Sequence, residues 1–243
     1  MYFYLMIALK LYCFYHFYKN RTDYYWIFVI IFIPVLGPIL YLVTQVYNKR
    51  DAEKITTELT HIINPTKKVK DLEKQLEFSE SYQNRVNLAD AYFEIKDYNN
   101  ALPHYLEALD DSSQTDFYVS GKLVEVYFLV EDYNNAILYG DSIKTHTEFK
   151  KSRIQFIYGL AHEKLENFEE AEAHLRQIDI RYSFYEERLI LAKFLISRDK
   201  TDDAKDILED VSSESKHMTK PNKRLYRNTV LEVEKLLNDV NSM

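Results

Sequence analysis

The side chains best suited to chemistry in this sequence are seven histidines and a single cysteine, Cys13. One thiol forms no intrachain disulfide and no cysteine-based zinc site. The histidines lack the spacing of a metal-binding pair such as His-Glu-x-x-His. Four glycines supply neither a Gly-x-Gly-x-x-Gly turn nor a phosphate-binding loop in context. We therefore expect no catalytic residue, no metal site and no cofactor.

Charged residues are distributed unevenly along the chain. Residues 1–48 carry only Lys10, Lys19, Arg21 and Asp23 as charges, a net of +2, which leaves −9 on the rest of a chain whose net charge is −7. An acidic body argues against nucleic acid as a partner, because nucleic-acid surfaces require clustered basic residues. Gly (4) and Pro (5) are too few for the turns of an all-β fold, so we expect an all-α body.

Residues 24–47 have the composition of a membrane-spanning segment. No charge interrupts the run, which is long enough to cross a hydrocarbon core of about 30 Å. Aromatic residues stand at both ends, like the interfacial belts of membrane proteins: Tyr24, Tyr25, Trp26, Tyr41 and Tyr47. We expect this segment to be a membrane anchor.

The preceding apolar stretch, residues 2–18, is shorter and carries Lys10 near its middle. It is either a second span or a helix lying in the interface, because a charge at the bilayer centre is costly. A signal peptide is disfavoured by the missing basic start and small-residue cleavage site. We favour a hairpin of two helices around the loop Lys19–Asp23, which makes residues 1–48 the anchor.

Pro34, Gly37 and Pro38 interrupt the apolar run and predict a kink. With Tyr41 and the basic exit Asn48–Arg50, this pattern resembles the N-terminal membrane-anchoring region of bacterial cardiolipin synthases and related phospholipase D-type proteins. The resemblance implies attachment to a bacterial cytoplasmic membrane.

Catalysis in that family uses two copies of His-x-Lys-x4-Asp. The nearest match here is "HEKLENFE" (His162–Glu169), which ends in Glu and has no second copy. The resemblance therefore implies the anchor without the enzyme.

The pentapeptide "DYNNA" occurs at Asp97–Ala101 and again at Asp132–Ala136. Extending the alignment gives four similar units, at residues 87–109, 122–143, 157–178 and 189–211. A period near 34 residues built from two helical patterns is the tetratricopeptide repeat (TPR) signature. The pattern predicts a TPR-like α-solenoid of about four helix pairs with capping helices.

Each unit repeats the same side-chain types in the same places. The core of the first helix is expected at Leu88, Leu123, Tyr158 and Leu191. The gap between the helices is filled by Tyr92, Tyr127, His162 and Leu195. Alanine stands where the two helices approach most closely, at Ala101, Ala136, Ala171 and Ala204.

The domain organisation follows from these boundaries. Residues 49–80 form a linker and N-terminal capping helices, one of them over residues 51–63. Residues 81–217 hold the repeats, at about 82–115, 117–150, 152–184 and 185–215. Residues 218–243 contain an amphipathic C-terminal helix that is expected to cap the open end of the stack.

The first helices of such a stack line a groove that holds peptides or helices. The repeat register places twelve residues there: Val86, Asp90, Phe93, Tyr118, Glu125, Phe128, Arg153, Phe156, Leu160, Glu163, Leu189 and Lys193. Val86 and Asp90 stand where chaperone-tail-binding members of the TPR family have a Lys/Asn carboxylate clamp, so that activity is not implied. The alternative is that several of these side chains are buried by neighbouring turns or by the C-terminal helix.

These features predict a non-catalytic, membrane-anchored adaptor that binds an apolar or amphipathic protein segment in the groove. The alternative is an accessory subunit of membrane phospholipid (cardiolipin-type) metabolism that acts through its N-terminal hairpin. Lys49, Arg50 and Lys54 after the second span outnumber Lys19 and Arg21 in the loop, which favours a cytoplasmic body.

Overall fold

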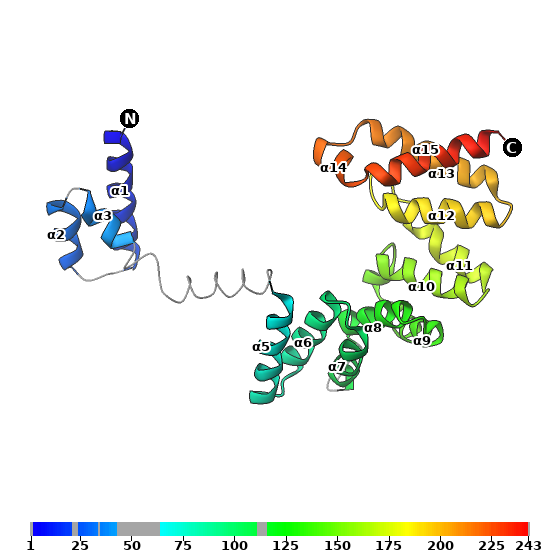
Figure 1. Cartoon of the computed structure of the whole chain (residues 1–243), viewed down its shortest axis with the longest axis horizontal. Coiled ribbons are helices and arrows are strands. Elements are labelled where there is room, and N and C mark those ends of the chain that lie inside the picture. The colour runs from blue at the N-terminus through cyan, green and yellow to red at the C-terminus, as the bar shows by residue number, and fades with distance from the viewer. Residues whose placement is uncertain (1, 21–23, 34, 43–63, 111–115, 243) are drawn as a thin grey trace. The chain divides into compact units, whose positions relative to one another are not determined.

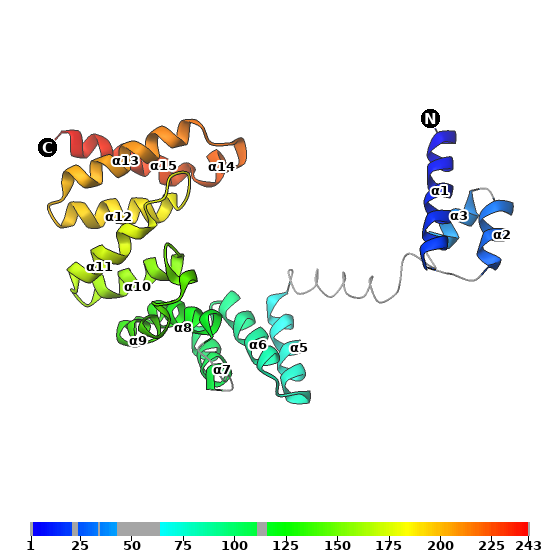
Figure 2. The ribbon, with the colours of Figure 1, turned by 180° about the vertical axis from the view of Figure 1, so that it is seen from behind.

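The computed structural model describes residues 2–20, 24–33, 35–42, 64–110 and 116–242 (Figure 1, and Figure 2 from behind). These residues form helices and turns, with no strand among them. The chain divides into two compact units, Met1–Lys70 and Asp71–Met243, and the boundary falls inside helix α5 (Pro65–Phe78). The helix expected over residues 51–63 lies outside the described residues.

In the described part of the N-terminal unit, three helices precede α5: α1 (Tyr2–Asn20), α2 (Tyr25–Phe32) and α3 (Leu36–Tyr41). Among the described residues, none of the helices combines the length and the apolar character needed to cross a bilayer. The predicted continuous segment over residues 24–47 is instead broken between α2 and α3, and its residues 43–47 lie outside the described residues. Pro38 occupies the first turn of α3, where its missing N–H leaves no helical bond unmade.

The predicted anchor residues form the core of this small unit. Trp26, Gly37, Pro38 and Tyr41 are buried, whereas Pro34 lies outside the described residues. The Trp26 and Tyr41 rings meet edge to face at 5.6 Å between centroids. These residues therefore hold the three helices of the unit together.

The second unit is a succession of helix pairs. The pairs are α6 (Tyr82–Glu94) with α7 (Tyr98–Asp110), α8 (Phe117–Leu129) with α9 (Tyr133–Ile143), α10 (Arg153–Lys164) with α11 (Phe168–Leu175), and α12 (Tyr185–Ser197) with α13 (Thr201–Lys216). Short 3-10 turns, η2 (Thr147–Phe149) and η3 (Arg176–Ile178), follow the second and third pairs. Helices α14 (Lys220–Leu225) and α15 (Arg227–Asn241) come last, and Val233 of α15 joins the core of the fourth pair.

The core of this unit follows the predicted register. The four repeated alanines, Ala101, Ala136, Ala171 and Ala204, have no exposed surface. Leu88, Leu123, Tyr158 and Leu191 are also buried, as expected for the first helix of each pair. The prediction of an all-α, TPR-like solenoid is therefore confirmed.

The turns inside the pairs explain why "DYNNA" repeats. Each first helix ends with a left-handed residue, at Lys96, Glu131, Glu166 and Asp199. The following N–H closes the helix by donating to a carbonyl five residues back, as Asp132 does to Tyr127 at 2.9 Å. The Asp132 carboxylate then caps the next helix by accepting from the N–H (3.2 Å) and the side-chain amide (2.6 Å) of Asn135. Asp97 and Asn100 repeat this arrangement.

Replacing Asp132 with alanine is expected to lower the free energy of unfolding by about 1 kcal/mol, because the first N–H groups of α9 lose their cap. Chemical denaturation followed by circular dichroism measures the change. Asn134→Ala is the matched control, since Asn134 is exposed in the same turn of the same helix. Equal losses in the two variants would contradict the capping role.

Candidate functional site

A pocket of about 490 Å3 lies along the first helices of the repeats, and we call it the first-helix pocket. Residues from α6, α8, α10 and α12, together with Tyr98 of α7, contribute to its lining. The lining residues are Phe93, Tyr98, Lys122, Glu125, Phe128, Leu129, Arg153, Phe156, Ile157, Leu160, Glu186, Glu187 and Ile190. Such a site, spread over several successive repeats, suits an elongated ligand better than a small molecule.

Aromatic rings are held in the pocket in a repeated geometry. Phe93 packs against Tyr98 with ring centroids 5.6 Å apart and planes inclined by 59°. One repeat later, Phe128 packs against Tyr133 at 5.6 Å and 58°. The tyrosine of each "DYNNA" segment therefore fixes the phenylalanine that ends the preceding helix. The two rings offer a preorganised apolar surface.

Each cation of the pocket has a carboxylate near it. The Lys122 ammonium lies 3.1 Å from a Glu125 oxygen and 4.4 Å from the centroid of the Phe93 ring. Arg153 approaches Glu187 at 3.9 Å. Pairs of this partly exposed kind contribute little stability, so a charged partner can displace them at small cost. The mixture of rings and weak charge pairs suits an amphipathic segment.

The structure brings together half of the twelve residues predicted for the groove. Phe93, Glu125, Phe128, Arg153, Phe156 and Leu160 all line the first-helix pocket. Phe156 is only 2% exposed, so most of its ring belongs to the core. Val86 and Leu189 are buried in the core as well. For Phe156, Val86 and Leu189, the alternative interpretation therefore holds, because neighbouring elements bury their side chains.

The remaining predicted residues lie away from the pocket lining. Asp90 accepts hydrogen bonds from the hydroxyls of Tyr105 (2.6 Å) and Tyr118 (2.8 Å). Burial and the Asp90 carboxylate raise the pKa of both phenols, so the tyrosines stay neutral donors. Lys193 pairs with Glu232 of α15 at 2.5 Å, and Glu163 is half-buried on α10.

Comparison with known proteins places this architecture in a family. A family model described as 26S proteasome subunit RPN7 matches residues 48–196, which is more than half of the 243 residues. The chain belongs to the RPN7 family. Residues 1–47, which carry the run resembling cardiolipin synthases, lie outside the match. Among curated proteins, none matches the sequence significantly.

Solved structures resemble this RPN7-family chain at low sequence identity. MamA (residues 41 to the end) from Desulfovibrio magneticus RS-1 shares 14% identity, covering 68% of this chain and 94% of its own, with a TM-score of 0.60. A tetratricopeptide repeat protein from Parabacteroides merdae shares 15%, covering 80% and 76%, at 0.57. BtubC from P. vanneervenii shares 13%, covering 75% and 89%, at 0.51. These likenesses show the fold alone, and they confirm the TPR-like helical repeat.

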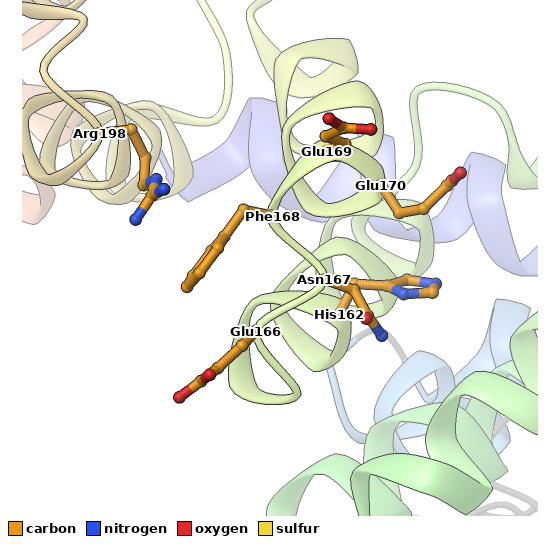
Figure 3. A pocket seen from close by; sticks show the side chains of 7 residues that line it. All are labelled: His162, Glu166, Asn167, Phe168, Glu169, Glu170 and Arg198. Atoms are coloured by element: carbon orange, nitrogen blue, oxygen red, sulfur yellow. The ribbon is translucent and has the colours of Figure 1, made fainter.

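A second, more open pocket of about 500 Å3 lies at the turn of the third repeat (Figure 3). Five residues of the "HEKLENFE" segment, the nearest match to a phosphodiesterase motif, line it: His162, Glu166, Asn167, Phe168 and Glu169. The Arg198 guanidinium stacks over the Phe168 ring at 4.0 Å, while the His162 ring is turned the other way. No group of three or more His, Cys, Asp or Glu residues suited to a metal ion occurs in the part of the chain that the structure describes. This segment is therefore best explained as a repeat turn.

Stacked rings lie between the helices of the first three pairs, and the sequence predicted only one ring of each stack. Tyr92 stacks on His104 (5.9 Å, 5° between planes), Tyr127 on Tyr139 (5.4 Å, 8°) and His162 on His174 (6.2 Å, 11°). The register predicted the first ring of each pair and missed the second. The signal was present, because His104, Tyr139 and His174 are themselves spaced by the repeat length.

Proposed function

We propose that this RPN7-family protein is a non-catalytic adaptor at the cytoplasmic face of a bacterial membrane. Its N-terminal unit attaches to the lipid bilayer. Its repeats bind an apolar or amphipathic segment of a protein partner in the first-helix pocket. The observation that carries the binding role is the pocket itself, in which fixed aromatic rings from successive repeats adjoin weak, displaceable ion pairs.

Exposed apolar side chains on the pocket rim support a protein ligand. Leu129 is 46% exposed and Ile190 is 39% exposed, and they belong to α8 and α12 respectively. A partner that covers both would bury aliphatic surface on two separate repeats, which is how helices and extended peptides dock in grooves.

The surface of the N-terminal unit supports membrane attachment. Helices α1, α2 and α3 each expose large apolar side chains, with Leu11, Phe28, Phe32 and Leu36 each more than 60% exposed, and the exposed charge of Lys19 stands at the end of α1. Two polar contacts lie inside the unit. The Cys13 thiol donates to the Pro38 carbonyl at 3.7 Å, and the Tyr41 hydroxyl lies 3.1 Å from a ring nitrogen of His16. Exposed apolar side chains around a core whose few polar groups pair with one another are typical of a structure solvated by lipid.

The alternative, an accessory subunit of phospholipid metabolism acting through the N-terminal hairpin, has less support. Gly37 and Pro38 are buried at a helix contact, where they serve packing and offer no exposed group to a lipid head. The family match covers most of the repeats and excludes the hairpin. Both observations favour the adaptor.

Site-specific photocrosslinking in the native membrane tests the pocket. A photoreactive phenylalanine analogue at Leu129 or Ile190 is expected to give a discrete protein adduct. Adding Phe93→Ala and Phe128→Ala should reduce the adduct yield by about tenfold or more, because truncating buried aromatic anchors costs more than about 1.4 kcal/mol of binding.

The matched control places the analogue at Leu138, which is 60% exposed on α9 and does not line the pocket. Circular dichroism verifies that the double variant is folded. Adducts of the same size and yield from Leu138, or adducts that survive the two alanine substitutions, would refute binding in the first-helix pocket.

A further inference from the structure

The chain reverses direction between α2 and α3. In a continuous helix, residues eight positions apart are about 12 Å apart along the axis. Here a Cβ added to Gly37 would lie 2.1 Å from the carbonyl oxygen of Val29, eight residues earlier. The start of α3 is thus pressed against the last turn of α2. Only glycine permits this approach, because any side chain would collide with the Val29 backbone.

The two ends of the α2–α3 hairpin (Tyr25–Tyr41) lie together beside the end of α1. The Tyr24 ring, just before α2, meets the Phe17 ring of α1 at 6.2 Å. Tyr41, which ends α3, contacts both Trp26 of α2 and His16 of α1, with ring centroids 5.6 and 5.8 Å apart. Figure 1 and Figure 2 agree in placing the last turn of α1, the first turn of α2 and the last turn of α3 at one end of the unit.

The polarity of the surface changes along the hairpin. The described residues of its tip expose aliphatic and aromatic side chains: Phe32 (75%), Ile33 (41%), Val35 (55%) and Leu36 (62%). Its base exposes Tyr24 (80%) and Tyr25 (54%), next to Tyr18 and Lys19 at the end of α1. Tyrosine and lysine belong at the headgroup level, and aliphatic residues belong in the hydrocarbon. This gradient fits insertion into lipid with the tip leading.

We infer that the α2–α3 hairpin is a re-entrant element, which enters the bilayer tip first and returns to the side from which it came. The inference rests on the proposed membrane attachment. A span over residues 24–47 would put Lys19 and Asn64 on opposite sides of the membrane. The re-entrant hairpin puts them on the same side.

Shared sidedness changes the charge argument for orientation. With a crossing segment, Lys19 and Arg21 compete with Lys49, Arg50 and Lys54 for the cytoplasmic side. With the re-entrant hairpin, the positive charges that precede and follow it in the sequence favour the same side and no longer compete. That side is the one with anionic lipid, so the hairpin base rests on the cytoplasmic leaflet.

Cysteine accessibility in the full-length protein tests the topology. The background is Cys13→Ser, which retains a donor for the Pro38 carbonyl. Single cysteines replace Lys19 at the hairpin base, Val35 at the tip and Asn64 after the exit, all of which are exposed. A membrane-impermeant polymer maleimide is added to spheroplasts and, separately, to inverted membrane vesicles.

Lys19→Cys and Asn64→Cys are expected to react in inverted vesicles, and both reactions are lost in spheroplasts. Val35→Cys reacts from neither side until detergent is added. Labelling of Lys19→Cys and Asn64→Cys from opposite sides overturns the re-entrant hairpin and leaves the adaptor intact. Release of the protein from membranes by alkaline carbonate overturns membrane attachment itself, so the two failures are distinguishable.

Discussion

Replacing Arg188 with methionine is expected to lower the free energy of unfolding by about 3–5 kcal/mol, the usual cost of breaking a buried ion pair from one side. Arg188 lies on α12 with no exposed surface. Its Nε donates to Asp179 at 2.8 Å and its Nη1 donates to Glu214 at 2.9 Å. The side chain of Glu214 is 1% exposed, so losing the guanidinium leaves a buried carboxylate with only the largely exposed Arg181, at 3.7 Å, as a cation.

A loss of this size is a large part of the stability of a typical domain, and it should be visible as a lower denaturation midpoint. Arg181→Met is the matched control, because Arg181 is 67% exposed and belongs to the same cluster, 3.3 Å from Asp210 and 3.7 Å from Glu214. That change should cost less than about 1 kcal/mol. If both variants lose the same stability, the buried pair is not the cause.

A double variant separates the lost charge from the lost packing. Glu214 also accepts a hydrogen bond from the Tyr182 N–H at 2.7 Å, and glutamine at that position keeps an acceptor there. Arg188→Met with Glu214→Gln removes both charges, so it should recover part of the stability that Arg188→Met loses. A double variant less stable than Arg188→Met would contradict this account.

Arg188 also illustrates what the sequence could not predict. The repeat register assigns positions within a helix pair, and it predicted the alanines and the first ring of each stack correctly. The partners of Arg188 are Asp179, nine residues earlier in the loop between η3 and α12, and Glu214, 26 residues later in α13. Their spacing in the sequence does not indicate that they are neighbours. A buried ion pair is a property of three-dimensional packing, so a single sequence leaves it hidden.

The groove residues show a limit of a different kind. The register predicted which helices line the pocket, and it predicted Phe93 and Phe128 among the lining residues. It could not separate the pocket from the core, because one step of 100° around a helix moves a side chain from one to the other. Val86, Phe156 and Leu189 accordingly proved to be buried.

The break in the N-terminal apolar run was predicted as a kink from Pro34, Gly37 and Pro38. A kink and a reversal have the same sequence signals. Prolines and glycine indicate where a helix is interrupted, and they do not determine the direction of the chain after the interruption. The direction follows from the contact of Gly37 with the Val29 backbone, which only the structure supplies.

Acidification below about pH 6.5 is expected to destabilise the repeats through the stacked histidines. Burial lowers the pKa of His104, His162 and His174 below the ordinary value of 6.5. Neither ring nitrogen of His162 has a hydrogen-bond partner, so a proton there would be buried without compensation. His174 faces His162, and a charge on either ring lowers the proton affinity of the other.

The sign follows from proton binding in the two states. Well above pH 6.5 the three histidines are neutral in both states, and they contribute no pH dependence to the free energy of unfolding. As the pH falls below 6.5, these histidines bind protons in the unfolded chain but remain neutral in the folded chain, so the free energy of unfolding decreases. Each such histidine contributes a slope of up to about 1.4 kcal/mol per pH unit until its folded pKa is reached.

The groups facing the His162–His174 pair modify this slope without reversing it. Glu170 lies 3.9 Å from His174 and, with Asp141, favours the protonated rings, whereas Lys144 opposes them. Gln155 lies 3.2 Å from Nδ1 of His174 through its side-chain amide. None of these groups outweighs burial, which is the largest cause of the lowered pKa at both rings.

The preceding repeat supplies the matched variant, because Tyr127 and Tyr139 stack at the positions equivalent to His162 and His174. Denaturation curves between pH 7.5 and 5 should show a smaller loss of stability for His162→Tyr with His174→Tyr than for the unaltered chain, since the replacement rings take up no proton in this range. His217→Asn is the control for removing an exposed histidine. An equal loss in the tyrosine variant and the unaltered chain would show that acid acts elsewhere, on ion pairs such as Arg188–Glu214, and not on the stacked rings.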